Sequence, residues 1–600
     1  MSHDEAAPSV ADQVVARLGE WGVERVYGYA GDGNNPLLGA LRRAGSPEFV
    51  RARHEESAAF MAVGEAKFGG RAGVVTSTQG PGAVHLLNGL YDAKLDSVPV
   101  VALVGQQHTT VLGSDYQQEI DLQTLFADVA ARFVQTVAAP EQLPMVLDRA
   151  FRAALTHRQP AVVILPHDVQ QAPAAELGQA HGEVVTAPRW SEGRLLPREE
   201  DLDAALAVLE TGERIAILAG RGAAHAGDAV IELAEALDAG VATSLLGKPY
   251  IDEAHPLVTG TMGHLGTTAS ARLLQGCDTL LIIGSNDPWT EYYPPPGAAR
   301  AVQIDVDPSV IGNRYPVEAG LAGDAAATIR SLLERLGPHR RGRPAWREEV
   351  ESAVRDWHDI SRLRAELPGE PLGPELVVRG LGERLDVDWR LAVDVGSAVY
   401  HYVRQMRLPP GHSAHLSSTL ASMGCGAPYG IAAKELDPGR PVAVLAGDGA
   451  MQMLGNTDLV TVAERWRRWR DPRFLVLVLH NRDLSEVSWE QREMETEPRF
   501  PASQDVPPFD FAGYAELLGL RGIRVSGPEG VAAALDEALA ADRPVVVEAR
   551  TDADAPLLPP LPHGREQLDA MRTGLAAEGA SGRHARELLT AYARIEEDRQ

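Results

Sequence analysis

The sequence predicts an α/β protein built from three doubly wound parallel-sheet domains, and three observations support this prediction. Short runs of branched apolar residues alternate with amphipathic segments of helix length, which is typical of parallel sheets buried on both faces. These runs fall into three groups, separated by stretches rich in glycine, proline and charged residues. The length of 600 residues also exceeds what one hydrophobic core usually serves.

Each group contains several runs of strand length, bounded by residues that favour turns. The first group has runs at 73–77, 99–105 and 161–166, the second at 214–220, 279–285 and 302–307, and the third at 390–396, 442–447, 474–479 and 544–549. The linkers between the groups predict domains at residues 1–180, 195–340 and 365–555. A charged tail at 556–600 follows, which we expect to form a solvated helix. Its largely acidic polar face disfavours a membrane-binding helix.

Charge and cysteine content narrow the class of protein. The 56 basic and 83 acidic residues give a net charge of −27, which disfavours binding to nucleic acid and to anionic membranes. No apolar run is long enough to cross a bilayer. The start MSHDEAAPSV lacks the basic and apolar segments of a secretory signal, and Cys277 and Cys425 are the only cysteines. We therefore expect a soluble cytoplasmic enzyme without a disulfide framework.

The letters AGDG occur twice, at residues 30–33 and 446–449, and only the second copy has the surroundings of a metal site. Asp448 follows one buried-strand pattern and Asn481 follows the next, with room between them for a helix and a crossover, so both would emerge at the carboxyl ends of neighbouring strands. Carboxylate and amide oxygens suit Mg²⁺, and a glycine turn before a helix suits a diphosphate. In the first copy the asparagines follow directly, which predicts a strand-to-helix turn or, less favoured, a pocket wall.

Ordered motifs in the first and third groups carry a resemblance to a known family. They are RARHEESAAFMAVGEAKFGG and TSTQGPGAVHLLNGLYDAKLDSVPVVALVGQQ, then AVDVGSAV, LASMGCGAPYGIAA, LAGDGAMQML and LHNRDLSEVSWEQR. The chain resembles the thiamine-diphosphate-dependent 2-oxoacid family that contains pyruvate oxidase, quinone-dependent pyruvate dehydrogenase and acetolactate synthase. The resemblance covers about residues 5–555. It implies a pyrimidine-binding first domain, a central flavin-type domain and a diphosphate-binding third domain, with thiamine diphosphate and Mg²⁺ as cofactors.

Thiamine diphosphate reacts through its thiazolium C2, which is deprotonated when the aminopyrimidine adopts its imino tautomer. The resemblance assigns the carboxyl group that drives this tautomer to Glu55, and the following AAFMAVG predicts apolar, shielded surroundings. We expect the neighbouring His54 to be structural rather than a proton shuttle. Met423 is implied beneath the bend of the cofactor. Without the resemblance, a methionine there would more often be a core residue.

The resemblance also implies how the third domain holds the metal and the diphosphate. The metal ligands would be Asp448, Asn481 and the backbone carbonyl of Asp483. The other cofactor contacts expected in this domain are Gly396, Ser397, Gly447, Gly449 and Ala450. The chain departs from the family pattern at His480, where an asparagine is usual, so the diphosphate contacts near this residue stay open.

Substrate contacts are implied at Gln118, Val487 and Glu490, although a surface acid is the alternative for Glu490. The family usually has Phe-Gln-Glu where this chain has Gln117, Gln118 and Glu119. An amide in place of the aromatic ring leaves open whether the substrate is pyruvate or a larger or more polar 2-oxoacid.

The middle group resembles the flavin domain of pyruvate oxidases through AGRGAAHAG, TSLLGKPY, GTMGHLGT, GSNDPWTEYYPPP and VQIDVDPSVIGNRYP. The flavin contacts implied are Gly220, Gly222, Ser285, Asn286, Asp305 and Asp307. Each is weak separately, because a Gly-x-Gly turn occurs in many nucleotide folds and in domains that have lost their ligand. Together they favour bound FAD. With a redox-active flavin, the decarboxylated intermediate would be oxidised; without one, it would be protonated or would attack a second carbonyl.

Three hypotheses about function follow. The leading one is a flavin-linked 2-oxoacid oxidoreductase, and the second is a carboligase or a simple decarboxylase that uses the same cofactor. A non-catalytic protein is disfavoured because Glu55, Asp448 and Asn481 are all present. The resemblance also implies a homodimer or homotetramer in which Glu55 of one chain and Asp448 of another share each active site.

Overall fold

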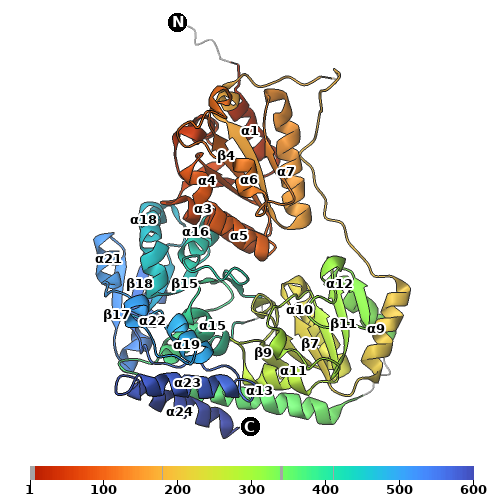
Figure 1. The fold of residues 1–600 in the computed structure, drawn as a ribbon, viewed down its shortest axis with the longest axis vertical. Helices are drawn as coiled ribbons and strands as arrows, with labels where there is room; N and C mark the ends of the chain where they lie inside the picture. The colour runs from red at the N-terminus through yellow and green to blue at the C-terminus, as the bar shows by residue number, and fades with distance from the viewer. Residues whose placement is uncertain (1–6, 179, 338–341, 410, 600) are drawn as a thin grey trace.

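The computed structural model describes residues 7–178, 180–337, 342–409 and 411–599. It contains three six-stranded sheets whose strands are all parallel, each flanked by helices (Figure 1). The predicted fold class of three parallel-sheet α/β domains is therefore confirmed. Among the described residues, no helix is long and apolar enough to span a membrane. Cys277 and Cys425 are both buried and free.

The first sheet has the strand order β2-β1-β3-β4-β6-β5. Its strands are β1 (Arg25–Gly28), β2 (Glu48–Arg51), β3 (Gly73–Ser77), β4 (Val100–Gln106), β5 (Val134–Thr136) and β6 (Pro160–Pro166). Its helices are α1 (Val10–Glu20), α2 (Asn35–Ala44), α3 (Glu55–Gly69), α4 (Pro81–His85), α5 (Leu87–Leu95), α6 (Leu122–Phe126), α7 (Leu143–His157) and α8 (His167–Gln171). The first AGDG copy is the predicted turn, because α2 begins at Asn35 directly after a short 3₁₀ segment.

The second sheet has the order β12-β11-β10-β7-β8-β9. Its strands are β7 (Ile215–Ala219), β8 (Gly240–Thr243), β9 (Val258–Thr261), β10 (Thr279–Ile283), β11 (Arg300–Asp305) and β12 (Ala319–Ala322). Its helices are α9 (Glu199–Thr211), α10 (Gly227–Leu237), α11 (Thr268–Gly276) and α12 (Ala325–Leu336), and the long helix α13 (Pro344–Ala365) leads to the third domain. The direction of winding changes between β7 and β10, which creates a switch point where open α/β sheets bind ligands.

The third sheet has the order β14-β13-β15-β16-β18-β17. Its strands are β13 (Arg390–Val393), β14 (Ser413–His415), β15 (Val442–Gly447), β16 (Phe474–His480), β17 (Arg521–Val525) and β18 (Val545–Arg550). Its helices are α14 (Pro374–Gly382), α15 (Ser397–Gln405), α16 (Gly426–Leu436), α17 (Asp448–Ala450), α18 (Asn456–Arg465), α19 (Ser485–Met494), α20 (Pro501–Gln504), α21 (Phe511–Leu517) and α22 (Val531–Leu539).

Helix α3 is buried on nearly all sides because it lies between its own sheet and α16 of the third domain. A Cβ atom on Gly64 would lie 3.0 Å from the Cα atom of Tyr429, so glycine permits this close approach. The resulting core is shared between the first and third domains, which lie side by side in Figure 1.

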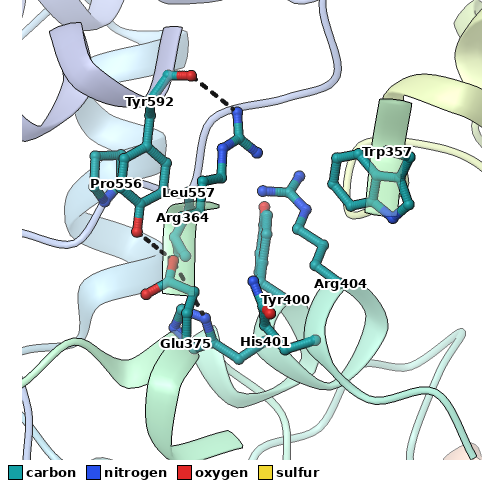
Figure 2. Close-up of a pocket in the computed structure, with 10 residues that line it drawn as sticks. Trp357, Arg364, Glu375, Tyr400, His401, Arg404, Pro556, Leu557 and Tyr592 are labelled. Carbon is teal, nitrogen blue, oxygen red and sulfur yellow. Dashed lines mark hydrogen bonds and ion pairs between the residues drawn. The ribbon is translucent and has the colours of Figure 1, made fainter. Parts of the chain in front are cut away.

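The carboxyl-terminal segment is not a solvated helix, and that expectation is wrong. It forms a hairpin of two helices, α23 (Arg565–Ala577) and α24 (Arg583–Glu597), packed beneath the third domain (Figure 1). Its apolar positions form a buried stripe that includes Leu568, Met571, Leu575 and Leu589. Tyr592 donates a hydrogen bond to the Glu375 carboxylate, and Arg364 pairs with Glu596 and lies beside Tyr592 in Figure 2. Most charged residues of the two helices are exposed, whereas Glu596 is buried.

Candidate active site

The carboxyl ends of β15 and β16 bring Asp448 next to the segment that carries Asn481. The two strands are neighbours, with Gly447 paired to Leu479. Asp448 is buried, its Oδ1 atom accepts a hydrogen bond from the Gly449 amide at 2.8 Å, and its Oδ2 atom accepts one from the Arg482 amide at 2.6 Å. The predicted adjacency of the two strand ends is confirmed, whereas the ligand roles stay a prediction.

Asn481 and Asp483 form the turn that follows β16. The Oδ1 atom of Asn481 accepts from the Asp483 amide at 3.0 Å, and its Nδ2 atom donates to Ser485 at 3.0 Å. The Asp483 carboxylate is held by Ser488 at 2.9 Å and by Arg499 at 2.6 Å. Burial raises the pKa of Asp448 to about 6, and burial also raises the pKa of Asp483. A divalent cation would favour the ionised form of Asp448, and this turn offers the hard oxygen donors that Mg²⁺ prefers.

Two glycines border open space at neighbouring strand ends. Gly396 follows β13 with a φ of 121°, and Gly447 ends β15; a Cβ atom on either would meet no atom within 4 Å. Ser397 begins α15, whose N-terminal amides suit a phosphate group. Gly449 differs, because its Cβ atom would lie 2.8 Å from the end of the Leu484 side chain, which would have to shift to admit a methyl group. Ala450 is buried in the short helix that follows. We call the turn formed by Asn481 and Asp483 after β16 the metal turn. The residues present therefore fit a diphosphate next to this turn.

Met423 lies in a loop that is held by hydrogen bonds to Asp394. The sequence analysis did not predict a role for Asp394. Asp394 is 1% exposed and accepts hydrogen bonds from the amides of Val395, Gly424 and Gly426 at 2.9, 2.7 and 2.9 Å. Burial raises its pKa to about 6. The sequence could have pointed to Asp394, because this residue follows a buried-strand pattern in AVDVGSAV just as Asp448 follows one in LAGDGAMQML. The Met423 sulfur would lie 3.7 Å from a Cβ atom on Gly449, which places Met423 at the Asp448 turn.

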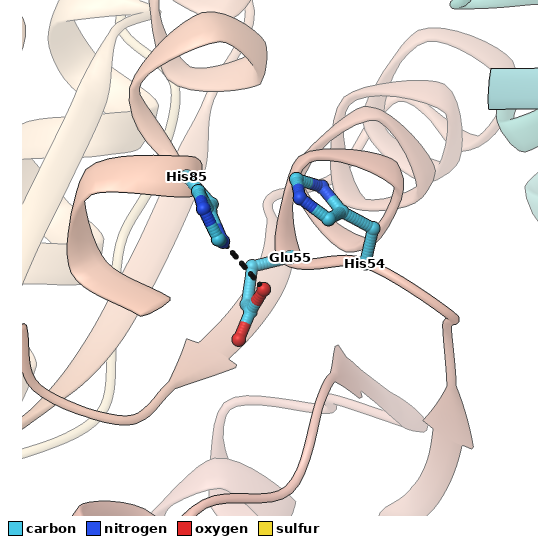
Figure 3. Close-up of side chains that lie close together, drawn as sticks. All are labelled: His54, Glu55 and His85. Atoms are coloured by element: carbon cyan, nitrogen blue, oxygen red, sulfur yellow. Dashed lines mark hydrogen bonds and ion pairs between the residues drawn. The ribbon is translucent and has the colours of Figure 1, made fainter. Parts of the chain in front are cut away.

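Glu55 begins α3 and is 7% exposed, in agreement with the expected shielding. Its Oε2 atom lies 3.0 Å from Nδ1 of His85, which ends α4 (Figure 3). His54 caps α3 by accepting the Glu56 amide on Nδ1 at 3.2 Å, which is a structural role. No sequence signal marked His85 as the partner of Glu55.

Within one chain, the start of α3 contacts the third domain close to Met423. Asn88 of α5 donates hydrogen bonds to the Glu56 carboxylate and, at 2.8 Å, to the Ser422 hydroxyl. Ser57 donates to the buried Asp458 at 3.3 Å. Among the residues that the structure describes, no hydrogen bond or ion pair joins Glu55 to Asp448.

The predicted substrate contacts lie on two different domains. Val487 is 49% exposed and Glu490 half-buried on α19, which begins soon after Asn481. Gln118 lies in the first domain with a φ of 62° and accepts a hydrogen bond from Gln79 at 3.1 Å. In the described part of the chain, no hydrogen bond joins Gln118 to α19.

Glu486 is a further acid on α19 that the sequence analysis missed. It lies one helical turn before Glu490, so the two carboxyl groups share a face of the helix. Burial, followed by the charge of Glu490, raises the pKa of Glu486 to about 7, and burial raises the pKa of Glu490 as well. The helix next to Val487 therefore holds two acids whose pKa values burial raises above those of ordinary carboxyl groups.

The six candidate flavin contacts lie at or just after the carboxyl ends of the neighbouring strands β7, β10 and β11, near the switch point of the second sheet. Packing explains the two glycines: a Cβ atom on Gly220 would lie 2.2 Å from the Gly284 carbonyl oxygen, and one on Gly222 would lie 2.6 Å from the Gly284 Cα atom. They bring two turns together and are not by themselves evidence of flavin.

The other candidates offer polar groups around this switch point. The Ser285 hydroxyl is buried and has no hydrogen-bond partner among the described residues. Asn286 is exposed. Asp305 accepts the Asp307 amide at 2.9 Å, and Asp307 accepts the Ser309 amide at 2.9 Å. The unpartnered hydroxyl at a switch point fits a polar ligand such as a dinucleotide.

Comparison with known proteins identifies the family of each domain. Models of the thiamine pyrophosphate enzymes match at residues 8–125 for the N-terminal TPP binding domain, 202–332 for the central domain and 394–549 for the C-terminal TPP binding domain. The putative thiamine pyrophosphate-containing protein YdaP of Bacillus subtilis is 35% identical over 566 residues, which cover 94% of this chain and 95% of that protein.

Two relatives named as enzymes are similar over almost the same length. The pyruvate oxidase of Lactiplantibacillus plantarum is 30% identical over 572 residues, covering 94% of this chain and 91% of that enzyme. The acetolactate synthase isozyme 2 large subunit of Escherichia coli is 29% identical over 573 residues, covering 94% and 99%. Since all three domain models match in order, the chain belongs to the thiamine pyrophosphate enzyme family that contains pyruvate oxidase and acetolactate synthase, as the sequence motifs predicted.

Proposed function

We propose that this thiamine-diphosphate-dependent enzyme decarboxylates a 2-oxoacid such as pyruvate and oxidises the decarboxylated product through FAD. The observation that carries the proposal is the turn after β16, where the Arg482 amide binds Asp448 beside Asn481, next to the open space bordered by Gly396 and Gly447. That arrangement combines hard oxygen donors, which suit Mg²⁺, with open space at two glycines and a helix N-terminus, which suit a phosphate group.

Each residue of the chain has a distinct task in this proposal. Asp448, Asn481 and the Asp483 carbonyl hold Mg²⁺, and Ser397 with the two open glycines receives the diphosphate. Met423, held in place by Asp394, supports the bend of the cofactor. Bound thiamine diphosphate supplies the carbon nucleophile for decarboxylation. Glu55 donates a proton to the pyrimidine ring nitrogen, and its burial strengthens that hydrogen bond because little water competes for it.

The substrate would lie between Gln118 of the first domain and Val487 and Glu490 of α19. Oxidation would use FAD at the switch point of the central sheet, where the unpartnered Ser285 hydroxyl supports a bound ligand. The alternative function is that of an acetolactate synthase-like carboligase or a non-oxidative decarboxylase, because relatives named as acetolactate synthases match the chain almost as well as pyruvate oxidase does.

The proposal includes a homodimer or a homotetramer, with Glu55 and Asp448 of each active site contributed by different chains, and a cytoplasmic location. Thiamine diphosphate has a pyrimidine end and a diphosphate end, and two α/β domains whose strand ends face each other can enclose both. When two chains pair about a two-fold axis, two such sites form at once.

Two measurements test the function. We expect Asp448→Ala to abolish calorimetric binding of thiamine diphosphate at millimolar Mg²⁺, whereas the exposed-acid control Asp542→Ala should bind normally. If Asp448→Ala bound thiamine diphosphate with unchanged affinity, Asp448 would not be a metal ligand. The purified protein should show a flavin absorption spectrum and reduce an artificial electron acceptor with pyruvate. Acetolactate formation without acceptor reduction would favour the carboligase instead.

A further inference from the structure

The hairpin of α23 and α24 forms the wall behind α19, the helix that carries the proposed substrate contacts. Trp489 of α19 is 1% exposed and belongs to the same buried cluster as the hairpin residues Leu568, Met571 and Leu575. The hairpin lies outside the part of the chain that the family models match, which ends at residue 549. These family models therefore give it no role.

A bidentate ion pair joins the two elements. Nε of Arg492 lies 2.7 Å from Oε1 of Glu578, and an Nη2 hydrogen bond of 3.2 Å reaches Oε2. The two side chains are 1% and 6% exposed, and the guanidinium lies 4.6 Å from the centre of the Trp489 ring. Glu578 also accepts the Arg499 amide at 3.0 Å. A buried, bidentate, charge-assisted pair constrains geometry more tightly than apolar contact alone.

The backbones of the two helices also approach closely. A Cβ atom on Gly574 of α23 would lie 2.8 Å from the Glu497 carbonyl oxygen and 3.2 Å from the Cα atom of Arg492. Both neighbours are backbone atoms, so a methyl group at Gly574 would force α19 and α23 apart. The spacing between the helices is therefore set by this glycine as well as by the ion pair.

The face of α19 that meets the hairpin is opposite the face that meets the substrate in the proposed function. The buried stripe includes Ser485, Ser488, Trp489 and Arg492, which recur at helical spacing. The fifth buried residue of the helix, Glu493, lies 3.2 Å from Nε2 of His264 in the second domain. Val487 and Glu490 lie on the other side, exposed and half-buried. Any rotation or shift of α19 against the hairpin would move these two side chains directly.

We propose that the carboxyl-terminal hairpin is a positioning element for the 2-oxoacid site, acting on α19 through the Arg492–Glu578 pair and the Gly574 contact. The proposal rests on the proposed function for its effect on substrate. The effect of the hairpin on the local stability of α19 does not depend on substrate.

The test compares Glu578→Ala and Gly574→Ala with the control Glu566→Gln, which changes an exposed acid of α23. We expect both alanine variants to raise the KM for the 2-oxoacid on the order of tenfold, with kcat and thiamine diphosphate affinity within about twofold of wild type. Amide exchange at residues 485–494 should be roughly tenfold faster in Glu578→Ala, and Glu578→Gln, which keeps an acceptor oxygen, should recover most of the protection.

Gly574→Ala keeps every charge and favours helix, so it carries the test if Glu578→Ala does not fold. The positioning role of the hairpin would be overturned if both alanine variants matched Glu566→Gln in amide exchange at residues 485–494 and in KM for the 2-oxoacid. Absence of 2-oxoacid turnover in the wild-type enzyme would overturn the proposed function instead, and exchange at 485–494 would then decide the positioning role by itself.

Discussion

The Nδ1 atom of His480 lies 3.1 Å from Oε1 of the buried Glu548, and its Nε2 atom lies 4.0 Å from Oδ2 of Asp448. The histidine that departs from the family pattern thus links an acid of β18 to the proposed metal ligand after β15. Burial opposes ionisation of Glu548, yet hydrogen bonds from His480, the Ala512 amide and Arg550 lower its pKa to about 2. Within the described residues, Nε2 of His480 has no hydrogen-bond partner. This nitrogen is the one that lies 4.0 Å from Asp448.

His480→Leu should therefore destabilise the protein. The substitution removes the hydrogen bond to Glu548 and leaves that buried charge with fewer partners, which costs about 1–3 kcal/mol. Urea unfolding of the apo protein measures the loss, with the exposed His181→Leu as a control. Equal stability of the two variants would show that the remaining donors satisfy Glu548 without the histidine.

Glu55→Gln should bind thiamine diphosphate nearly normally but turn over slowly. The amide can still contact the pyrimidine ring, whereas it cannot donate the proton that stabilises the imino tautomer. Deuterium exchange at the thiazolium C2 is the direct measurement, and we expect it to slow by about 10²–10⁴-fold. Glu56→Gln, next to Glu55 and hydrogen-bonded to Asn88, is the matched control. An exchange rate equal to that of wild type would remove Glu55 from the mechanism.

Mixing Glu55→Gln with Asp448→Ala subunits should restore activity. If each site takes Glu55 from one chain and Asp448 from another, a hybrid dimer contains one site with both defects and one site with neither. Steady-state turnover after subunit exchange, followed by native mass spectrometry, measures the recovery. A mixture that contains hybrids and stays as inactive as its parents would contradict the shared site.

Glu486 should make the stability of the apo protein depend on pH between about 4.5 and 7. Burial, followed by Glu490, raises its pKa from 4.5 to about 7, so the folded chain holds a proton that the unfolded chain releases in this window. The free energy of unfolding therefore falls as the pH rises through it. Glu486→Gln removes this contribution, and its melting temperature should fall less between pH 5 and pH 8 than that of wild type. Parallel melting profiles of the two proteins would falsify the shift.

Gly220→Ala and Ser285→Ala should separate packing from flavin binding. The first places a methyl group against the Gly284 carbonyl oxygen and should cost about 1–3 kcal/mol of stability with or without flavin. The second removes a buried hydroxyl that lacks a partner, so the flavin-free protein should keep its stability while FAD affinity falls. Thermal unfolding and fluorescence titration with FAD measure the two effects. Unaltered FAD binding in Ser285→Ala would exclude this hydroxyl as a contact.

The longer buried strands could be predicted because a strand covered on both faces is largely apolar along its length. The run at 442–447 is β15, and the run at 474–479 is β16 to within one residue. The partly exposed edge strands β5 and β17 were not predicted, since neither has a continuous apolar run. The four-residue strands β1, β8 and β9 were also missed although they are mostly buried, because polar residues and glycine interrupt their short apolar runs. The carboxyl-terminal hairpin was misjudged for a related reason: its apolar stripe is spread among many charges and becomes a core only against α19.

The sequence by itself determined the family, the three parallel sheets and the meeting of Asp448 with the Asn481 turn, because strand order and chain length permit few other arrangements. Only the tertiary structure decided that Asp394 holds the Met423 loop, that Gly220 meets Gly284, and that Arg492 pairs with Glu578. Each of these contacts joins residues far apart in the chain. Their formation depends on how helices and turns pack together, and no local pattern of residues records that packing.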